Sequence, residues 1–225
     1  MDSMYGALNN VRADNQLSQK DCLSIYKNDG DIKVLFIGNS ITKHGPAPDI
    51  GWNGNWGMAA SALENDYVHL VVNSLREKVS VDYSIAQCSR WEQNYSDTEN
   101  FLKNNYQDLQ DFEADIIIVR IGENVKLKND EEEFKENFRK MISFFDKNKK
   151  AKIIVTNLFW KQEIINRIIK EVALENNYVF CDISDLEENE KTMAIGEYEH
   201  RGVSVHPSDY GMKRIAEKIL ECIET

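Results

Sequence analysis

The sequence predicts an α/β domain built around a parallel sheet, and two patterns carry this prediction. Short apolar runs, rich in β-branched and aromatic residues, recur along the chain and are typical of strands buried on both faces. Longer segments with apolar residues at helical spacing lie between them. Strands alternating with helices indicate an α/β sandwich with right-handed crossovers. A chain of 225 residues suffices for one such domain with an added terminus.

Five segments are expected to form the strands. Four are nearly continuous apolar runs, at residues 32–37, 114–121, 152–156 and 178–181. The fifth, at residues 79–85, alternates apolar and polar side chains. This alternation predicts a strand with one wetter face, at an edge of the sheet.

The helices are expected between the strands, where apolar residues recur every three or four positions. These segments are residues 67–78, 131–147, 160–176 and 210–223. Residues 1–30 are polar and carry only a weak apolar stripe, which predicts a helical arm packed on a domain of residues 31–225.

Composition and charge exclude several classes of function. With 27 Lys and Arg against 38 Asp and Glu, the net charge of −11 argues against nucleic acid as a partner. No apolar run approaches the ~20 residues of a membrane span. The four cysteines form no CxxC pair, and the four histidines have no ligand spacing, so we expect neither a metal nor another cofactor. Reduced thiols and the lack of an apolar leader predict a cytoplasmic protein.

The chemistry of a parallel sheet lies outside the carboxyl ends of its strands. Ser40 follows the run 32–37, Asn124 follows the run 114–121, and His206 precedes the last helix. Taken alone, each has an ordinary interpretation, as a helix cap, a turn residue and a loop histidine. Together they supply a nucleophile, an amide donor and a general base at one edge of the sheet.

Three short blocks extend this into a family resemblance. Gly38-Asn39-Ser40-Ile41-Thr42, Gly122-Glu123-Asn124 and His206-Pro207 resemble, in order and spacing, the blocks of the SGNH (GDSL-like) hydrolases. The resemblance implies a flavodoxin-like three-layer α/β/α sandwich with a five-stranded parallel sheet. It also implies hydrolysis of carboxylic esters without a cofactor. Ser40 would be the nucleophile and His206 the base, with Asn124 and the Ser40 backbone N–H as oxyanion donors.

Two positions depart from that family. The Asp that usually stands three residues before the histidine is Val203 here, which implies a Ser–His dyad. His206 would then be held by a main-chain carbonyl or by a carboxylate from elsewhere, the candidates being Glu197, Glu199 and Glu123. The block that usually supplies a glycine as third oxyanion donor reads 87–92 without glycine. The backbone N–H of Ser89 or Arg90 is the expected substitute.

The segment 44–57 after the nucleophile is rich in Trp, Gly and Pro, which predicts a shaped loop over the cleft. We expect it to bind a sugar, because indole faces suit pyranose rings and amides suit hydroxyls. The alternative is that the tryptophans cover the loop's own small core. The substrate-binding candidates are Asn39, Trp52, Asn53, Trp56, Trp91 and Glu123.

Two histidines outside the blocks have weaker signals. His44 could line the cleft, and His69 is expected to be surface or core filler. The glycine spacing 51, 54 and 57 is not a dinucleotide fingerprint and no P-loop lysine follows, which excludes a nucleotide site.

The expected function is therefore that of a serine esterase acting on a small acyl ester, preferably an O-acetylated carbohydrate. Two alternatives remain open at this point. The same acyl-enzyme could transfer its acyl group to a sugar, or the chain could bind carbohydrate after losing catalysis, as Val203 suggests. The acidic net charge favours a neutral sugar ester over an anionic one.

Overall fold

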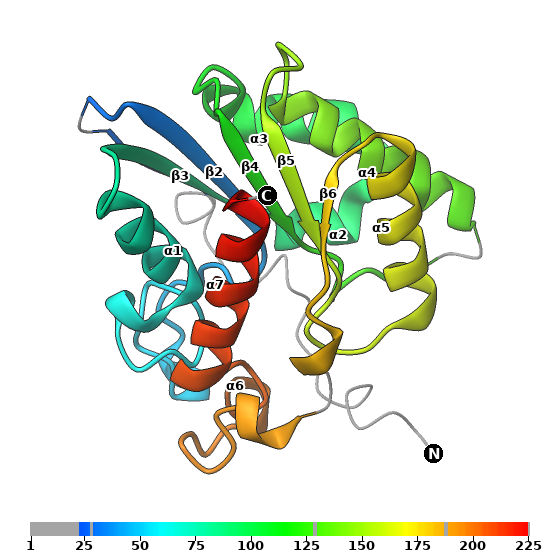
Figure 1. The fold of residues 1–225 in the computed structure, drawn as a ribbon. Helices are drawn as coiled ribbons and strands as arrows, with labels where there is room; N and C mark the ends of the chain where they lie inside the picture. The colour runs from blue at the N-terminus through cyan, green and yellow to red at the C-terminus, as the bar shows by residue number, and fades with distance from the viewer. Residues whose placement is uncertain (1–22, 28, 128–129, 187–188, 225) are drawn as a thin grey trace.

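The computed structural model describes residues 23–27, 29–127, 130–186 and 189–224 (Figure 1). Its centre is a six-stranded sheet with strand order β1-β3-β2-β4-β5-β6. Neighbouring strands are parallel from β3 to β6, and β1 pairs antiparallel with β3. The strands are β1 Leu23–Tyr26, β2 Ile32–Gly38, β3 Val81–Gln87, β4 Ile116–Arg120, β5 Lys152–Thr156 and β6 Val179–Cys181.

Helices cover both faces of the sheet, giving three layers (Figure 1). One face carries α1 (Tyr67–Arg76) and α7 (Asp209–Glu224). The other carries α2 (Ser89–Asn94), α3 (Thr98–Gln110), α4 (Glu131–Phe145) and α5 (Glu163–Glu175). The short α6 (Arg201–Ser204) lies beyond the lower end of the sheet in Figure 1. Single 3-10 turns lie at Pro48–Ile50, Leu63–Asn65, Tyr95–Asp97, Ser184–Leu186 and Glu190–Thr192.

The predicted α/β sandwich is confirmed, and the five predicted strands are the five parallel ones, β2 to β6. The four predicted helices are α1, α4, α5 and α7, with ends shifted by at most three residues. Helices α2 and α3 have no counterpart in the prediction. Their sequence is mostly polar, and the few apolar positions that they bury, such as Trp91 and Leu102, form too thin a stripe to show.

The predictions for the first strand and its neighbour need correction. Residues 1–22 of the expected helical arm lie outside the described residues, but Leu23–Tyr26 is a strand and not a helix. Tyr26 stacks on Tyr83 of β3, with ring centroids 4.5 Å apart. Because β1 pairs with it, β3 is buried along its whole length and is not an edge strand. A four-residue edge strand has too few side chains to reveal its period in the sequence.

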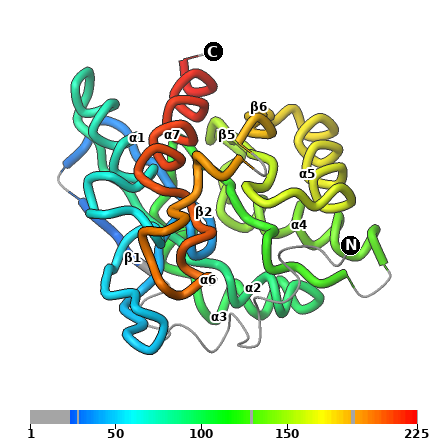
Figure 2. Tube along the Cα trace, turned by 90° about the horizontal axis from the view of Figure 1, so that it is seen from below, coloured from blue at the N-terminus to red at the C-terminus, as the bar shows by residue number. Residues whose placement is uncertain are grey.

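The strand order fixes where the loops meet. Without β1, the order is that of a doubly wound flavodoxin-like sheet, whose switch point lies between β2 and β4. Gly38 ends β2, and a Cβ there would stand 1.7 Å from the Thr42 hydroxyl, so the tight turn that follows requires glycine. Gly122 follows β4 with φ of 140°, which also favours glycine. Figure 2, seen from below, shows α6 in front of this end of the sheet.

Candidate active site

A serine and a histidine meet at the switch point of the sheet. Ser40 stands in the turn after β2, which closes through N–H groups of Thr42 and Lys43 donating to the Asn39 carbonyl at 2.9 and 3.0 Å. His206 lies between α6 and α7, where its carbonyl accepts the Ala194 N–H at 2.9 Å. The Ser40 Oγ and the His206 Nε2 are 2.8 Å apart, although 166 positions separate the residues in the chain. This is hydrogen-bonding distance for a nucleophile and its base.

The other ring nitrogen of His206 is buried and, among the described residues, has no hydrogen-bond partner. Val203 is fully buried and apolar, and Glu197 and Glu199 are exposed. The carboxylate of Glu123 bonds elsewhere, to Arg120 and Asn39. The carbonyls of Gly202 and Val203 favour the protonated ring, but neither has hydrogen-bond geometry with Nδ1. None of the three candidate carboxylates therefore holds the ring, and the main-chain carbonyls of Gly202 and Val203 are the groups that favour its protonated form.

Burial sets the charge state of the histidine. Loss of hydration lowers the pKa of His206 to about 3, and the nearby His44 ring acts in the same direction. The imidazole is therefore neutral at physiological pH. For Nε2 to accept the Ser40 hydroxyl proton, the single ring proton must sit on Nδ1. His206 is thus in the form that a general base requires.

An indole holds the histidine ring where a carboxylate would otherwise do so. Trp160 meets His206 edge to face, with ring centroids 4.9 Å apart and planes at 85°. The indole is itself anchored, because its Nε1–H donates to the Val205 carbonyl at 3.1 Å. Sequence reasoning placed Trp160 at the start of a helix and missed this role. Its position soon after β5 was the available signal.

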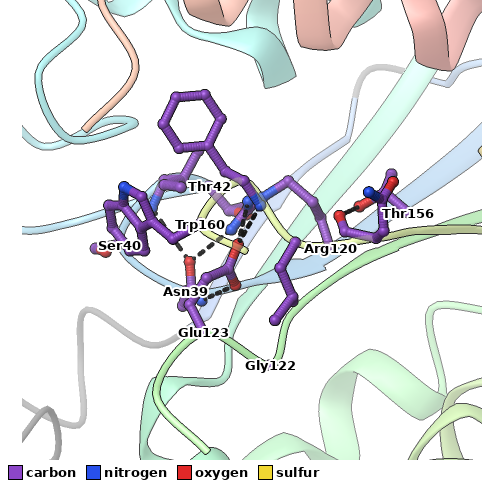
Figure 3. Close-up of polar contacts among 12 residues, drawn as sticks. Asn39, Ser40, Thr42, Arg120, Gly122, Glu123, Thr156 and Trp160 are labelled. Atoms are coloured by element: carbon purple, nitrogen blue, oxygen red, sulfur yellow. Dashed lines mark hydrogen bonds and ion pairs between the residues drawn. The ribbon is translucent and has the colours of Figure 1, made fainter. Parts of the chain in front are cut away.

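Beneath Ser40 lies a buried charged group formed by Asn39, Arg120 and Glu123 (Figure 3). The guanidinium of Arg120 donates to Glu123 Oε1 at 2.6 Å and to Asn39 Oδ1 at 2.9 Å. The amide of Asn39 donates in turn to Glu123 Oε2 at 2.6 Å. Glu123 also accepts the Phe159 N–H at 3.2 Å, which links the β4 and β5 loops. These three side chains support the nucleophile turn from below.

A second buried carboxylate, Glu92, contacts the predicted oxyanion donor. The side-chain amide of Asn124 donates to Glu92 Oε2 at 2.6 Å. Glu92 Oε1 accepts the Asn39 amide at 3.2 Å as well. Burial, together with the negative charge of Glu123, raises the pKa of Glu92 to about 7. Neither Glu92 nor Arg120 was among the sequence candidates, because polar residues in an amphipathic segment or ending a strand look unremarkable without the fold.

The two candidates for the third oxyanion donor, Ser89 and Arg90, differ in their hydrogen bonding and exposure. Both the N–H and the hydroxyl of Ser89 donate to Gln87 Oε1, at 3.2 and 2.9 Å. The Ser89 N–H is therefore already used within its own turn. Arg90 follows in the first turn of α2 and is partly exposed, so its role stays a prediction.

The tryptophan loop does not form the sugar-binding wall that the sequence predicts. Trp52 is 2% exposed, and it packs in a small apolar cluster of Trp52, Met58, Ala59, Ala194 and Val203. Trp91 is fully buried against the aromatic rings of Tyr95 and of Phe134 on α4. These two tryptophans cover core, which corrects their assignment to substrate.

The remaining substrate candidates divide by exposure. Asn39 and the Glu123 side chain are buried, so they support the site and do not line it. Asn53 is exposed and Trp56 is partly exposed. The Trp56 indole meets Trp52 edge to face at 5.7 Å, and its Nε1–H donates to the Ala60 carbonyl. Asn53 and Trp56 can still reach a ligand.

Searches for other kinds of site found little. In the part of the chain that the structure describes, no group of three or more His, Cys, Asp or Glu side chains could hold a metal ion. No helix within those same ranges is long and apolar enough to cross a membrane. His44 is buried and its Nδ1 lies 2.6 Å from the Gly45 carbonyl. His69 is also buried, between Asp66 at 2.7 Å and the Tyr83 hydroxyl at 3.1 Å, which agrees with a core residue.

Comparisons with solved structures find the same fold at low identity. A family two carbohydrate esterase from Clostridium thermocellum, in complex with cellohexaose, is 16% identical with a TM-score of 0.59 over 88% of this chain. A two-domain esterase active on acetylated mannans, crystallised with mannopentaose, is 15% identical with a TM-score of 0.54 over 86%. The chain spans only 65% and 49% of the lengths of these two proteins. An esterase, EstA, from Pseudoalteromonas sp., inhibited by monoethylphosphonate, is 11% identical with a TM-score of 0.54, over 86% of this chain and 97% of that one.

Comparison with curated proteins gives no match. A family model does match, the GDSL-like lipase/acylhydrolase family, over residues 36–214. The match includes Ser40, Asn124 and His206 and covers well over half of the chain. The chain therefore belongs to the GDSL-like lipase/acylhydrolase family, a family of carboxylic-ester hydrolases.

Proposed function

We propose that this chain hydrolyses small acyl esters through a Ser40–His206 dyad. The observation that carries the proposal is the 2.8 Å contact between Ser40 Oγ and His206 Nε2 at the switch point of the sheet. Ser40 Oγ attacks the carbonyl carbon while Nε2 takes the hydroxyl proton, which gives a tetrahedral oxyanion. The bond to the leaving alcohol then breaks, and the alcohol takes the proton from Nε2. Water repeats both steps on the acyl-serine and releases the acid.

The proposed oxyanion donors are the Ser40 N–H and the Asn124 side chain. An amide nitrogen carries two hydrogens, and Glu92 occupies only one of those on Asn124. Such a donor is worth about 10²–10³ in turnover. No carboxylate among the described residues contacts His206 to stabilise its protonated form. We therefore expect a slower enzyme than one with a complete triad.

The proposed substrate is an O-acetylated carbohydrate. The Trp160 indole lies beside His206 and is partly exposed, and Trp56 and Asn53 offer a second ring and an amide. These groups replace Trp52 and Trp91 as the proposed sugar contacts. The likeness to esterase structures solved with cellohexaose and mannopentaose supports a sugar, although that likeness concerns the fold.

Incubation with p-nitrophenyl acetate and a serine-directed phosphonate tests the reaction. We expect hydrolysis and stoichiometric labelling by the wild type, and neither by Ser40→Ala. Ser143→Ala is the matched control, because Ser143 is an exposed serine on α4, on another layer. Folded wild-type protein that remains unlabelled would overturn the proposal. Acetylated oligosaccharides then test the substrate, with release of free acetate as the expected result.

One alternative product must be measured in the same assay. The acyl-serine could pass its acyl group to a sugar hydroxyl if water were kept out. Ser40 is partly exposed, which favours water as the acceptor. Appearance of an acetylated acceptor in place of free acetate would assign acyl transfer instead.

A further inference from the structure

Glu92 is enclosed in the protein beside the active site and serves no purpose in the dyad itself. It lies on α2, in the segment 87–92 where this family usually has a glycine and this chain has none. The residue is 1% exposed. A buried carboxylate is costly unless its neighbours satisfy it, so its contacts indicate what it is for.

Among the described residues, every hydrogen bond to the Glu92 carboxylate comes from an N–H donor. Oε1 accepts from the Gly122 N–H at 2.7 Å, the Asn124 N–H at 3.1 Å and the Asn39 amide at 3.2 Å. Oε2 accepts from the Asn124 amide at 2.6 Å. An ionised carboxylate only accepts hydrogen bonds, so the site matches that form in all four contacts. A glutamine here would turn an N–H₂ group toward N–H donors.

Two of these contacts fix Asn124, one through its backbone and one through its side chain. The third contact, with Gly122, fixes the turn that carries Asn124 out of β4. One hydrogen of the Asn124 amide is thereby committed to Glu92, and this determines the rotation of the amide plane. The second hydrogen of the same nitrogen points about 120° away in that plane and stays free to donate.

We propose that Glu92 is a positioning residue, which orients Asn124 so that its second amide hydrogen meets the oxyanion at Ser40. This inference rests on the proposed function, because Asn124 has no oxyanion to meet without catalysis at Ser40. Glu92 itself touches no reacting atom. The negative charge of Glu92 also repels the oxyanion. If this repulsion were the larger effect, Glu92→Gln, which removes the charge and keeps the shape, would accelerate the reaction. Positioning makes the opposite prediction.

A double-mutant cycle distinguishes positioning of Asn124 from electrostatic repulsion by Glu92. Glu92→Gln and Asn124→Ala should each lower kcat for p-nitrophenyl acetate by about 10²–10³, with KM little changed. The double variant should be no slower than Asn124→Ala, because Glu92 acts only through Asn124. Glu123→Gln is the matched control, because it makes the same chemical change at a neighbouring buried carboxylate whose side chain contacts Arg120 and Asn39 and not Asn124. The factor by which Glu123→Gln lowers kcat should multiply with the factor for Asn124→Ala in the double variant.

A second measurement reports the contact without catalysis. In the wild type, the NMR signals of the Asn124 side-chain amide should be shifted and slow to exchange, and in Glu92→Gln they should become those of a free amide. Glu92→Asp is the second variant if glutamine prevents folding, because it keeps the charge and shortens the reach. The Glu92→Asp variant should show neither the wild-type Asn124 amide signals nor the full wild-type kcat.

The outcomes distinguish the two proposals. A wild type that neither hydrolyses esters nor reacts with the phosphonate overturns the proposed function. An active wild type whose Glu92→Gln and Asn124→Ala losses multiply, or whose Glu92→Gln variant is faster, overturns the role of Glu92 alone. Unchanged Asn124 amide signals in Glu92→Gln would do the same.

Discussion

Replacing Asn39 by aspartate would test the charge arrangement under the nucleophile. Its amide nitrogen donates to two buried carboxylates, Glu123 at 2.6 Å and Glu92 at 3.2 Å. Aspartate is nearly isosteric and is the usual family residue there, but it would put a third carboxylate where these two donor contacts now lie. The donors to Asn39 Oδ1 would gain from the change: the Arg120 guanidinium at 2.9 Å and, more weakly, the Ile41 N–H at 3.3 Å.

The expected cost follows from the hydrogen bonds that the substitution removes. A hydrogen bond to a charged group contributes about 1.5–3 kcal/mol, so the two together are worth about 3–6 kcal/mol. The stronger pairing with Arg120 offsets about 1 kcal/mol of this. We therefore expect Asn39→Asp to lower the free energy of unfolding by about 2–5 kcal/mol at pH 8. This is a large share of the 5–15 kcal/mol typical of a domain.

The cost should depend on pH in a defined direction. The pKa of Glu92 is already raised from 4.5 to about 7 in the folded protein, and a further negative charge would raise it more. A carboxyl whose folded pKa exceeds its unfolded value binds protons more tightly when folded, so stability rises as pH falls from about 7 toward 4.5. The defect of the variant should therefore shrink between pH 8 and pH 5.5.

Urea unfolding at both pH values measures this effect. With an m-value of about 3 kcal/mol/M, the midpoint should fall by about 1 M at pH 8 and by less at pH 5.5. Asn39→Asp combined with Glu123→Gln returns an amide to the pair and should recover part of the loss. A variant as stable as wild type at pH 8 would refute the reasoning, because it would mean that the two donor contacts contribute nothing.

Three further predictions concern the base. His206 should remain neutral from pH 5 to pH 8, since its pKa is lowered to about 3, and the NMR signals of its ring should not titrate in that range. Val203→Asp puts a carboxylate at the position that the family's aspartate usually takes; if it reaches Nδ1, it should raise the pKa of His206 toward 6.5 and move the acid limit of kcat/KM upward, and an unchanged pH profile would count against that contact. Trp160→Ala should lower kcat by about 10²-fold by releasing the ring, and Trp160→Phe should recover part of that loss, whereas equal rates in wild type and Trp160→Ala would exclude an orienting indole.

The strands and the ends of the parallel sheet could be predicted from the sequence because burial on both faces leaves continuous apolar runs. The run 152–156 coincides with β5. Ser40 and His206 could be assigned to the same edge of the sheet because one follows a strand and the other lies in the loop before the last helix, and the two side chains do meet there. Strand β1 could not be predicted, since four residues at an edge obey no burial pattern. Because β1 was not predicted, β3 was wrongly expected at an edge of the sheet. The alternation of apolar and polar residues in β3 does not mark a wet face, since its polar residues, such as Ser84, are buried.

The residues that line the site were harder to predict, because a tryptophan side chain is equally suited to packing in a core and to binding a sugar. Trp91 is amphipathic in sequence context but buries its N–H against Thr98 at 2.9 Å, which only the fold reveals. Nothing in the local sequence indicates that Glu92, one residue later, lies in the interior. Long-range hydrogen bonds of this kind leave no local period in the sequence.

The apolar cluster of Trp52, Met58, Ala59, Ala194 and Val203 has a consequence for durability. It joins the loop that follows the nucleophile to the loop that carries the base, and it is far smaller than the two clusters on the faces of the sheet. Regions with few buried contacts open at lower free energy than the main core. Ile41 and Val205, next to Ser40 and His206, pack in the large cluster under α1 and α7, whereas the loops that surround them pack in this smallest cluster. Heat or denaturant should therefore loosen the loops around the proposed dyad while the sheet is still folded. Loss of the proposed activity would then begin as a local and reversible event.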